Sequence, residues 1–179
     1  MTARVWLVRH GATIAPPGVA IGSSDPPLSE AGRAQADELA DRLASAQLTR
    51  VISSDLVRAI ETARPIAARH GLAVEPVRAL REIDFGEWEG RALTALWSEE
   101  EASFRNTPRG FGETFTDLEL RVTGWWHTVL AALEGEVAII AHRGSLAVLS
   151  AAITGCSVEA AFADRIEPGQ EKGPLDSLH

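Results

Sequence analysis

Short apolar runs alternate with longer amphipathic segments along most of the chain. The apolar runs have the length of buried strands and lie at 5–8, 50–54, 73–77 and 136–142. The amphipathic segments have the apolar spacing of helices and lie at about 30–46, 56–69, 92–104, 117–134 and 145–153. Alternating strands and helices are typical of a three-layer α/β/α sandwich with a mostly parallel central sheet, so we predict that fold.

Capping and breaking residues refine the ends of these helices. Ser29 is expected to cap the first helix, and Thr116-Asp117-Leu118-Glu119 indicates a capping box at the start of the fourth. Pro65 is expected to kink or interrupt the second helix, because proline removes a backbone donor and clashes with the preceding turn.

The chain has the size of one domain, and we predict a single domain over 1–179. A last strand is expected to start within 166–170. The polar residues 171–179 carry no helical or strand period, so we expect them to form a flexible tail.

Two of the predicted strands end in a histidine that is followed closely by a glycine. These stretches are Val5-Trp6-Leu7-Val8-Arg9-His10-Gly11 and Val137-Ala138-Ile139-Ile140-Ala141-His142-Arg143-Gly144. The carboxyl ends of parallel strands lie along one edge of a sheet, which is where α/β proteins place their ligands. We therefore expect His10 and His142 to share a pocket, although they are far apart in the sequence.

Two arginines would add positive charge to that pocket. Arg9 precedes His10, and Arg58 falls in the first turn of the second helix, where a cation is unfavourable unless an anion lies beside it. Guanidinium groups bind phosphate through paired hydrogen bonds, and a neutral imidazole is a competent nucleophile or base. The pocket therefore suits a dianionic phosphate. For the tripeptide Arg9-His10-Gly11 alone, a strand end with solvated polar residues is an equal alternative.

Two irregular segments hold further candidates. The loop 14–28 is rich in proline and glycine, and we expect it to wall the site because it follows the first histidine. The stretch 80–90 mixes carboxylates with aromatic residues and two glycines. A carboxylate near Phe85 and Trp88 would be partly desolvated, which favours the protonated form that a general acid needs.

Other conspicuous side chains receive structural interpretations. They are Glu87 and Glu89 as solvated loop acids, His70 as a residue that ends the second helix, His127 as structural or exposed, and Trp125 and Trp126 as core.

Composition excludes several functional classes. The net charge of −8 argues against nucleic acid or an anionic membrane as a partner. Cys156 is the only cysteine, so neither an intrachain disulfide nor a cysteine-based zinc cluster can form. No stretch has the length of a membrane span or the pattern of a signal peptide, so we expect a cytoplasmic protein.

Four motifs occur in a fixed order: Leu7-Val8-Arg9-His10-Gly11, then Ser53-Ser54-Asp55-Leu56-Val57-Arg58-Ala59 with Thr62-Ala63, then Arg81-Glu82-Ile83-Asp84-Phe85-Gly86-Glu87-Trp88-Glu89-Gly90, then Ala141-His142. Together they resemble the histidine phosphatase superfamily, the phosphoglycerate-mutase-like proteins. The resemblance extends from about Arg4 to Gly155, which is most of the chain.

The resemblance implies a role for each matching residue. His10 would be the nucleophile that carries a transient phosphohistidine. Arg9, Arg58 and His142 would bind the phosphoryl oxygens and stabilise charge during the transfer. Glu82 would protonate the leaving alkoxide and then activate water. Neither a metal nor a cofactor is implied.

The resemblance also implies a substrate class, a small phosphomonoester. We expect the protein to be a monomer or homodimer. The loop Pro16 to Leu28 and the run Phe85 to Gly90 look like the alpha-ribazole phosphatase branch, which acts in cobalamin assembly. Within this picture Gly22 is a candidate substrate-binding residue. Arg143 is another, and it departs from the family, which usually has a small residue after the second histidine.

Several alternatives remain open at this stage. The absence of a long insertion after Glu82 favours hydrolysis over mutase activity, but a phosphoglycerate mutase or a broad-specificity sugar phosphatase fits the same motifs. A metallohydrolase would use His10 and His142 with Asp25 or Asp84, although close metal-ligand spacings are lacking. A non-catalytic phosphoryl-binding regulatory module is an alternative from a different functional class.

Overall fold

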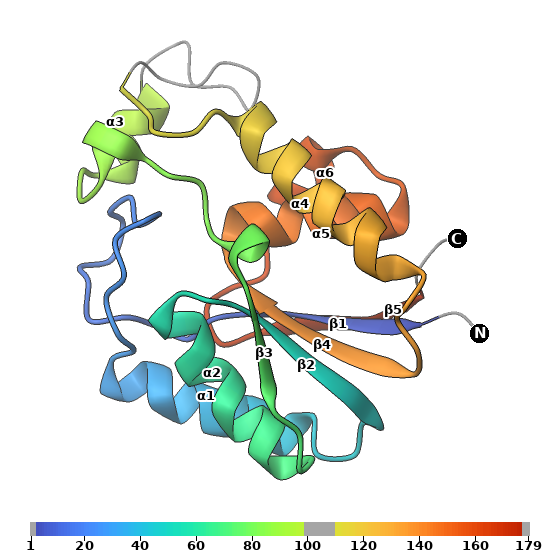
Figure 1. Cartoon of the computed structure of the whole chain (residues 1–179). Helices are drawn as coiled ribbons and strands as arrows, with labels where there is room; N and C mark the ends of the chain where they lie inside the picture. Colours follow the sequence, from blue (N-terminus) through green and yellow to red (C-terminus); the bar gives the residue numbers. More distant parts are fainter. Residues whose placement is uncertain (1–2, 99–109, 177–179) are drawn as a thin grey trace.

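A computed structural model describes residues 3–98 and 110–176, and it contains a central five-stranded sheet (Figure 1). The strand order is β3-β2-β4-β1-β5, and all neighbours are parallel except β5, which runs antiparallel to β1. The strands are β1 (Arg4–Arg9), β2 (Leu48–Ser54), β3 (Val74–Val77), β4 (Glu136–Ala141) and β5 (Glu171–Asp176). The predicted α/β/α sandwich with a mostly parallel sheet is confirmed.

Helices cover both faces of the sheet (Figure 1). Helices α1 and α2 lie on one face, and α4, α5 and α6 lie on the other. The helices are α1 (Glu30–Arg42), α2 (Val57–Arg69), α3 (Leu93–Ser98), α4 (Phe115–Leu130), α5 (Arg143–Thr154) and α6 (Val158–Ala163), with short 3-10 turns η1 (Arg78–Leu80) and η2 (Gly86–Trp88). Within the described residues, none of these helices has the length and apolarity needed to cross a membrane.

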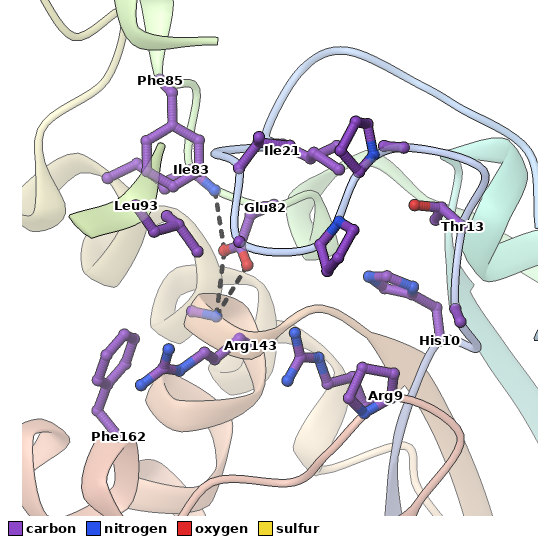
Figure 2. A pocket seen from close by; sticks show the side chains of 18 of the residues that line it. Arg9, His10, Thr13, Ile21, Glu82, Ile83, Phe85, Leu93, Arg143 and Phe162 are labelled. Atoms are coloured by element: carbon purple, nitrogen blue, oxygen red, sulfur yellow. Dashed lines mark hydrogen bonds between the residues drawn. The ribbon is translucent and has the colours of Figure 1, made fainter. Parts of the chain in front are cut away.

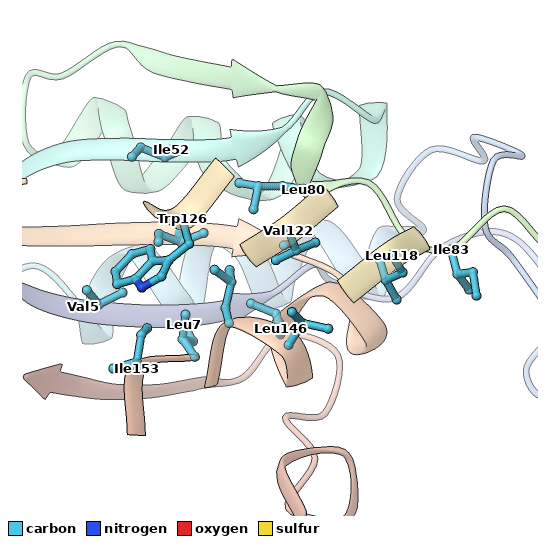
Figure 3. Close-up of a cluster of buried hydrophobic side chains, with 14 of the residues drawn as sticks. Val5, Leu7, Ile52, Leu80, Ile83, Leu118, Val122, Trp126, Leu146 and Ile153 are labelled. Carbon is cyan, nitrogen blue, oxygen red and sulfur yellow. The ribbon is translucent and has the colours of Figure 1, made fainter. Parts of the chain in front are cut away.

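Each central strand contributes to a core on both faces, which explains its continuous apolar run. Along β1, Leu7 packs into a cluster with Leu118, Trp126 and Leu146 from α4 and α5 (Figure 3). The next residue, Val8, points the other way and packs with residues of α1 and α2. Because both faces are covered, only the strand ends are left to carry polar side chains. Trp126 is buried and Trp125 packs against the same cluster, so both tryptophans are core residues as predicted.

The predicted position of the capping box and the predicted interruption at Pro65 were wrong. The capping box of α4 is formed by Thr114 and Asp117, two residues earlier than predicted, and the helix begins at Phe115. Helix α2 continues through Pro65 without interruption. Its buried residues, among them Ala63 and Ile66, pack on the sheet, and this packing outweighs the loss of one hydrogen bond.

The predicted flexible tail was also wrong. Glu171–Asp176 forms the edge strand β5, which pairs with β1 in a register that shifts between Val5 and Leu7. The sequence hid this strand because it is polar and contains Pro174, which an edge strand tolerates. Residues 177–179 lie outside the described part of the chain. The helix predicted at 92–104 is observed as Leu93–Ser98, with Ala92 just before it in an isolated bridge, and residues 99–104 lie outside the described part of the chain.

Candidate active site

A cavity of about 440 Å³ lies at the carboxyl edge of the sheet (Figure 2). Its polar lining comes from strand ends and the residues after them: Arg9, His10, Thr13, Glu82, Arg143 and Gly144. Its apolar lining comes largely from loops: Ala12, Ala15, Pro16, Pro17, Gly18, Val19, Ile21, Ile83, Phe85, Leu93, Phe115, Phe162 and Pro168. The loop that was expected to wall the site therefore does so.

His10 follows β1 and faces this cavity. Its Nδ1–H donates to the carbonyl oxygen of Gly11 at 2.8 Å, so the neutral ring carries its lone pair on Nε2. Burial, together with the positive charges of Arg58 and Arg9, lowers the pKa of His10 to about 3. The ring therefore stays neutral, and its Nε2 nucleophilic, over the physiological pH range.

Gly11 allows the chain after His10 to pass close to the start of α1. A Cβ at this position would lie 2.5 Å from the carbonyl oxygen of Gly32. The backbone N–H of Gly11 donates to the Thr62 hydroxyl at 3.1 Å, and that hydroxyl donates to the carbonyl oxygen of Arg58. The segment after His10 is therefore also fastened to α2, the helix that carries the second predicted arginine.

His142 follows β4 and packs beside His10, with 5.0 Å between the ring centroids. Its Nδ1 accepts from Arg58 Nε at 3.3 Å, and its Nε2–H donates to the Ser54 hydroxyl at 2.9 Å. The side chain is buried, which together with the charge of Arg58 lowers its pKa well below the ordinary value. The two histidines do share one site, but His142 lies behind His10 and does not line the cavity.

Arg58 is buried at the start of α2 and is held by the loop that precedes α1. Its Nη1 and Nη2 donate to the carbonyl oxygens of Ser24 and Gly22 at 2.8 and 2.9 Å. Asp25 accepts from the first backbone N–H of α2 at 2.8 Å and lies 3.5 Å from Arg58 Nη1. This carboxylate offsets the unfavourable placement of a cation at a helix N-terminus.

Gly22, predicted to contact substrate, does not line the cavity. It is packed so tightly that a Cβ would lie 1.9 Å from the carbonyl oxygen of Ile83. Its backbone N–H donates to Glu89 at 3.0 Å, and Ser23 N–H does so at 2.9 Å. The interpretation of Glu89 as a solvated acid was therefore wrong, because its carboxylate anchors the loop that holds Arg58. Glu87 is exposed, as is His127.

Arg9 lines the cavity between His10 and Arg143 (Figure 2). Its Nη1 donates to the carbonyl oxygen of Ile166 at 3.1 Å, which fixes the side chain against the segment after α6. Burial lowers the pKa of the guanidinium, and the charge of Glu82 opposes that effect. Its Nε is buried and has no hydrogen-bond partner within residues 3–98 and 110–176.

Glu82 projects into the cavity from the segment after η1 (Figure 2). Its carboxylate accepts from the backbone N–H of Gly144 at 3.1 Å and from that of Ile83 at 3.0 Å. Arg121 of α4 fixes the segment from behind, since its Nη1 donates to the carbonyl oxygens of Ala79 and Arg81 at 2.8 and 3.1 Å. Glu82 is thus held at the start of α5, beside the second histidine.

Sequence reasoning missed Arg121, although a signal was present. It is a charged residue three positions after Leu118, on the flank of the apolar stripe of the fourth predicted helix. The prediction that Arg143 contacts substrate has a geometric basis, because Arg143 lines the cavity and its Cζ lies 4.1 Å from the ring centroid of Phe162. Phe162 was also missed.

A search for three or more His, Cys, Asp or Glu side chains arranged to hold a metal ion finds none in the described ranges. The cavity combines a neutral histidine, two arginines and one carboxylate on a three-layer α/β sheet edge. The charges and donors of this arrangement suit an anionic phosphoryl group.

The chain belongs to the histidine phosphatase superfamily (branch 1), whose model matches residues 5–170. It is 35% identical over 171 residues to a Proteus mirabilis protein described as "Probable phosphoglycerate mutase GpmB", covering 90% of this chain and 78% of that protein. The alpha-ribazole phosphatase of Shigella flexneri superposes with a TM-score of 0.81 at 27% identity, covering 98% and 94% of the two chains. A mycobacterial glucosyl-3-phosphoglycerate phosphatase superposes with a TM-score of 0.83 at 29% identity, covering 97% and 90%.

Proposed function

We propose that the protein is a metal-independent phosphomonoester hydrolase that acts through a phosphohistidine on His10. The observation that carries the proposal is the orientation of His10. Its Nδ1 donates to the Gly11 carbonyl, while its Nε2 makes no hydrogen bond within the described part of the chain, and the ring faces the cavity with Arg9 and Glu82. Superfamily membership and structural similarity to two phosphatases support it.

The proposed reaction has two phosphoryl transfers. In the first, the lone pair of His10 Nε2 attacks phosphorus, the phosphorus–alkoxide bond breaks, and protonated Glu82 gives its proton to the leaving oxygen. In the second, the Glu82 carboxylate takes a proton from water, the resulting hydroxide attacks phosphorus, and phosphate leaves His10 with its electron pair returned to the ring. Arg9 supplies a fixed positive charge to the phosphoryl oxygens in both steps. His142 packs against His10, and Arg58 donates to His142. These two residues are proposed to complete the phosphoryl site.

The test is phosphate release from a panel of phosphomonoesters, with a chelator present. The panel includes alpha-ribazole 5′-phosphate and 3-phosphoglycerate. We expect wild-type turnover that is insensitive to chelation and is lowered at least about a thousand-fold in His10→Ala. Rapid acid-free quenching should trap a phosphoenzyme in the wild type and none in the variant. His127→Ala, exposed on α4, is the matched control, and full activity in His10→Ala would refute the proposal.

Glu82→Gln separates the acid from the nucleophile. An alkyl phosphate needs its leaving oxygen protonated, so we expect the rate of phosphoenzyme formation from such substrates to fall about 10²–10⁴-fold in the variant. 4-Nitrophenyl phosphate has a leaving group that is stable as an anion, so the rate at which it forms the phosphoenzyme should fall much less. Equal losses for both esters would contradict the assignment of Glu82 as the proton donor.

Phosphoglycerate mutase activity is a second candidate function, favoured by the identity to the Proteus mirabilis protein. A phosphoglycerate mutase returns the phosphoryl group to a hydroxyl of the glycerate before water attacks. Interconversion of 2- and 3-phosphoglycerate without net phosphate release would favour it, whereas phosphate release without interconversion would favour the hydrolase. Phosphate-ester binding without either reaction would support a regulatory module.

Several sequence-based expectations accompany the proposal. They are a small-molecule phosphomonoester as partner, without nucleic acid or a membrane, a monomer or homodimer, and a cytoplasmic location. A strong preference for alpha-ribazole 5′-phosphate would place the protein in cobalamin biosynthesis.

A further inference from the structure

The cavity has two chemically different ends (Figure 2). Arg9 and His10 occupy one end, and Glu82 lies between them and the other end. The far end is apolar and is lined by Ile83, Phe85, Leu93 and Phe162, with Arg143 beside them. If His10 receives the phosphoryl group and Glu82 protonates the leaving oxygen, the alcohol part of the substrate extends into this far end.

Arg143 and Phe162 form a platform on one side of the far end. The guanidinium carbon of Arg143 lies 4.1 Å from the centroid of the Phe162 ring, in a cation–π contact. Arg143 is the first residue of α5, and the next residue, Gly144, is hydrogen-bonded to Glu82 at 3.1 Å. The platform therefore has a fixed place relative to the proposed acid. Arg143 Nε is buried and has no hydrogen-bond partner within residues 3–98 and 110–176.

The wall of the far end opposite Arg143 and Phe162 is also held in place by specific contacts. The ring of Phe85 meets that of Phe111 edge to face, with 5.2 Å between centroids. The loop 14–28 is joined to the start of α3, because Leu93 N–H donates to the carbonyl oxygen of Gly18 at 2.7 Å and Val19 bridges Ala92. The apolar end is thus a preformed chamber with defined sides, which is the usual character of a small-molecule site.

We propose that this chamber binds an aromatic or heteroaromatic ring in the alcohol part of the substrate, and that the ring packs against Arg143 and Phe162. The proposal rests on the proposed hydrolase function. A polyhydroxylated alcohol would lose its hydrogen bonds to water against the side chains of Phe85, Leu93 and Phe162. A ring instead buries apolar area there and presents its face to a planar guanidinium that is already stacked on an aromatic ring.

A carboxylate-bearing substrate such as 3-phosphoglycerate is the competing class, because Arg143 could pair with its carboxylate. Such a substrate would leave the apolar side chains of the chamber without a partner. The two classes are therefore separable by substrates that differ only in the alcohol.

The experiment compares alkyl phosphates whose leaving alcohols are similarly basic. The ring substrate is 2-phenylethyl phosphate, and the polar substrates are glycerol 1-phosphate and 3-phosphoglycerate. We expect kcat/KM to be about ten- to a hundred-fold higher for the ring substrate, the range that apolar contacts in a pocket supply. Turnover of glycerol 1-phosphate or 3-phosphoglycerate at an equal or higher kcat/KM would overturn the inference and leave the hydrolase function intact.

A binding measurement keeps the inference testable if nothing is hydrolysed, the outcome that would overturn the hydrolase function alone. The probes are 3-phenylpropylphosphonate and 3,4-dihydroxybutylphosphonate. They correspond to 2-phenylethyl phosphate and glycerol 1-phosphate with the ester oxygen replaced by a methylene group. Calorimetric titration of the wild type should give tighter binding of the phenyl compound by about ten-fold or more. Equal binding of the two would overturn the inference.

Single variants test whether Arg143 and Phe162 cause the preference for the ring substrate. Phe162→Ala and Arg143→Leu should each reduce the ratio of kcat/KM for the ring substrate over glycerol 1-phosphate by about three- to ten-fold. Leu120→Ala is the control, since this side chain is exposed on α4, away from the cavity lining. If Arg143 instead holds the phosphoryl group, Arg143→Leu lowers kcat/KM for both substrates equally and the ratio is unchanged, which would overturn its place in the platform.

Discussion

His10 and His142 occur in closely similar local settings but have different hydrogen-bond environments. Each follows a central parallel strand, β1 or β4, and the two strands are neighbours in the sheet. His10 has one ring nitrogen committed to a backbone carbonyl and faces the cavity. His142 has both ring nitrogens occupied, by Arg58 and Ser54, and is buried behind it.

The comparison teaches that a strand-end histidine motif does not itself define a nucleophile. What separates the two residues is whether a ring nitrogen is free and has a path to a ligand. A neutral ring with an unprotonated Nε2 can attack phosphorus, whereas a ring that already donates from Nε2 can only orient or stabilise. The following predictions would break this distinction or make it sharper.

Among the changes that follow, removing the side chain of His142 is expected to have the largest effect. His142→Ala leaves Arg58 Nε without its acceptor and removes a positioned group behind the proposed nucleophile, so kcat/KM should fall about 100-fold or more. Phosphoenzyme should still be trapped by rapid quenching, because His10 is intact. The amide of His142→Gln can accept from Arg58 and donate to Ser54, so this variant should recover part of the lost kcat/KM. It also serves as a control for a folding defect in His142→Ala. Complete loss of phosphoenzyme in both variants would remove the distinction between the histidines.

Acid should destabilise the fold through the same residues. The unfolded chain takes up a proton on each histidine as the pH falls through about 6.5, whereas folded His10, with a pKa of about 3, does not. Stability from this source is therefore complete above pH 6.5 and is lost as the pH falls from 6.5 towards 3. Between pH 7.5 and 5.0, His10 alone should account for about 2 kcal/mol of the lost unfolding free energy.

The measurement is urea unfolding of the wild type and His10→Asn at both pH values. The variant should lose less stability than the wild type on acidification, by about that amount. His142→Asn should change the pH dependence in the same direction, since burial also lowers the pKa of His142. His127→Asn, on the exposed side of α4, is the control for replacing a histidine as such. An unchanged pH dependence in His10→Asn would show that the folded ring takes up its proton as readily as the unfolded chain does.

The smallest of these effects should come from Ser54→Ala. The change removes the acceptor for His142 Nε2–H at 2.9 Å and leaves a buried donor unpaired. We expect kcat to fall about ten-fold and the unfolding free energy to fall by about 1–3 kcal/mol, with KM nearly unchanged. Ser53→Ala is a matched control on the same strand, because the Ser53 hydroxyl donates to the carbonyl oxygen of the neighbouring Ser54. A kcat loss in Ser54→Ala no larger than in Ser53→Ala would mean that the Ser54 contact does not position His142.

The sequence predicted the residues that local patterns place at strand ends. Strand length, a charged stop and a glycine identified Arg9 and His10, and the same pattern identified His142. These signals lie within a few residues of one another, so one sequence is sufficient to see them. The superfamily motifs added Glu82, whose own surroundings have no regular period.

What the sequence did not reveal depends on contacts between distant segments. Glu89 holds Gly22 from 67 positions away, and Arg121 holds Ala79 from 42 positions away. No spacing rule links such pairs. The edge strand β5 was missed for a different reason, because it pairs with a single neighbour and therefore has no alternating or continuous apolar pattern to reveal it.

The division of the cavity lining between two kinds of backbone bears on how this protein can evolve. The groups proposed to act on the phosphoryl group stand on the ends of β1 and β4 or directly against them, where the buried sheet fixes their backbone. Most of the chamber wall stands on the loop 14–28 and the segment 83–93, which lie outside the strands of the sheet. Duplicated copies of the gene could therefore diverge towards new alcohols by altering the chamber wall while the reaction itself is inherited unchanged.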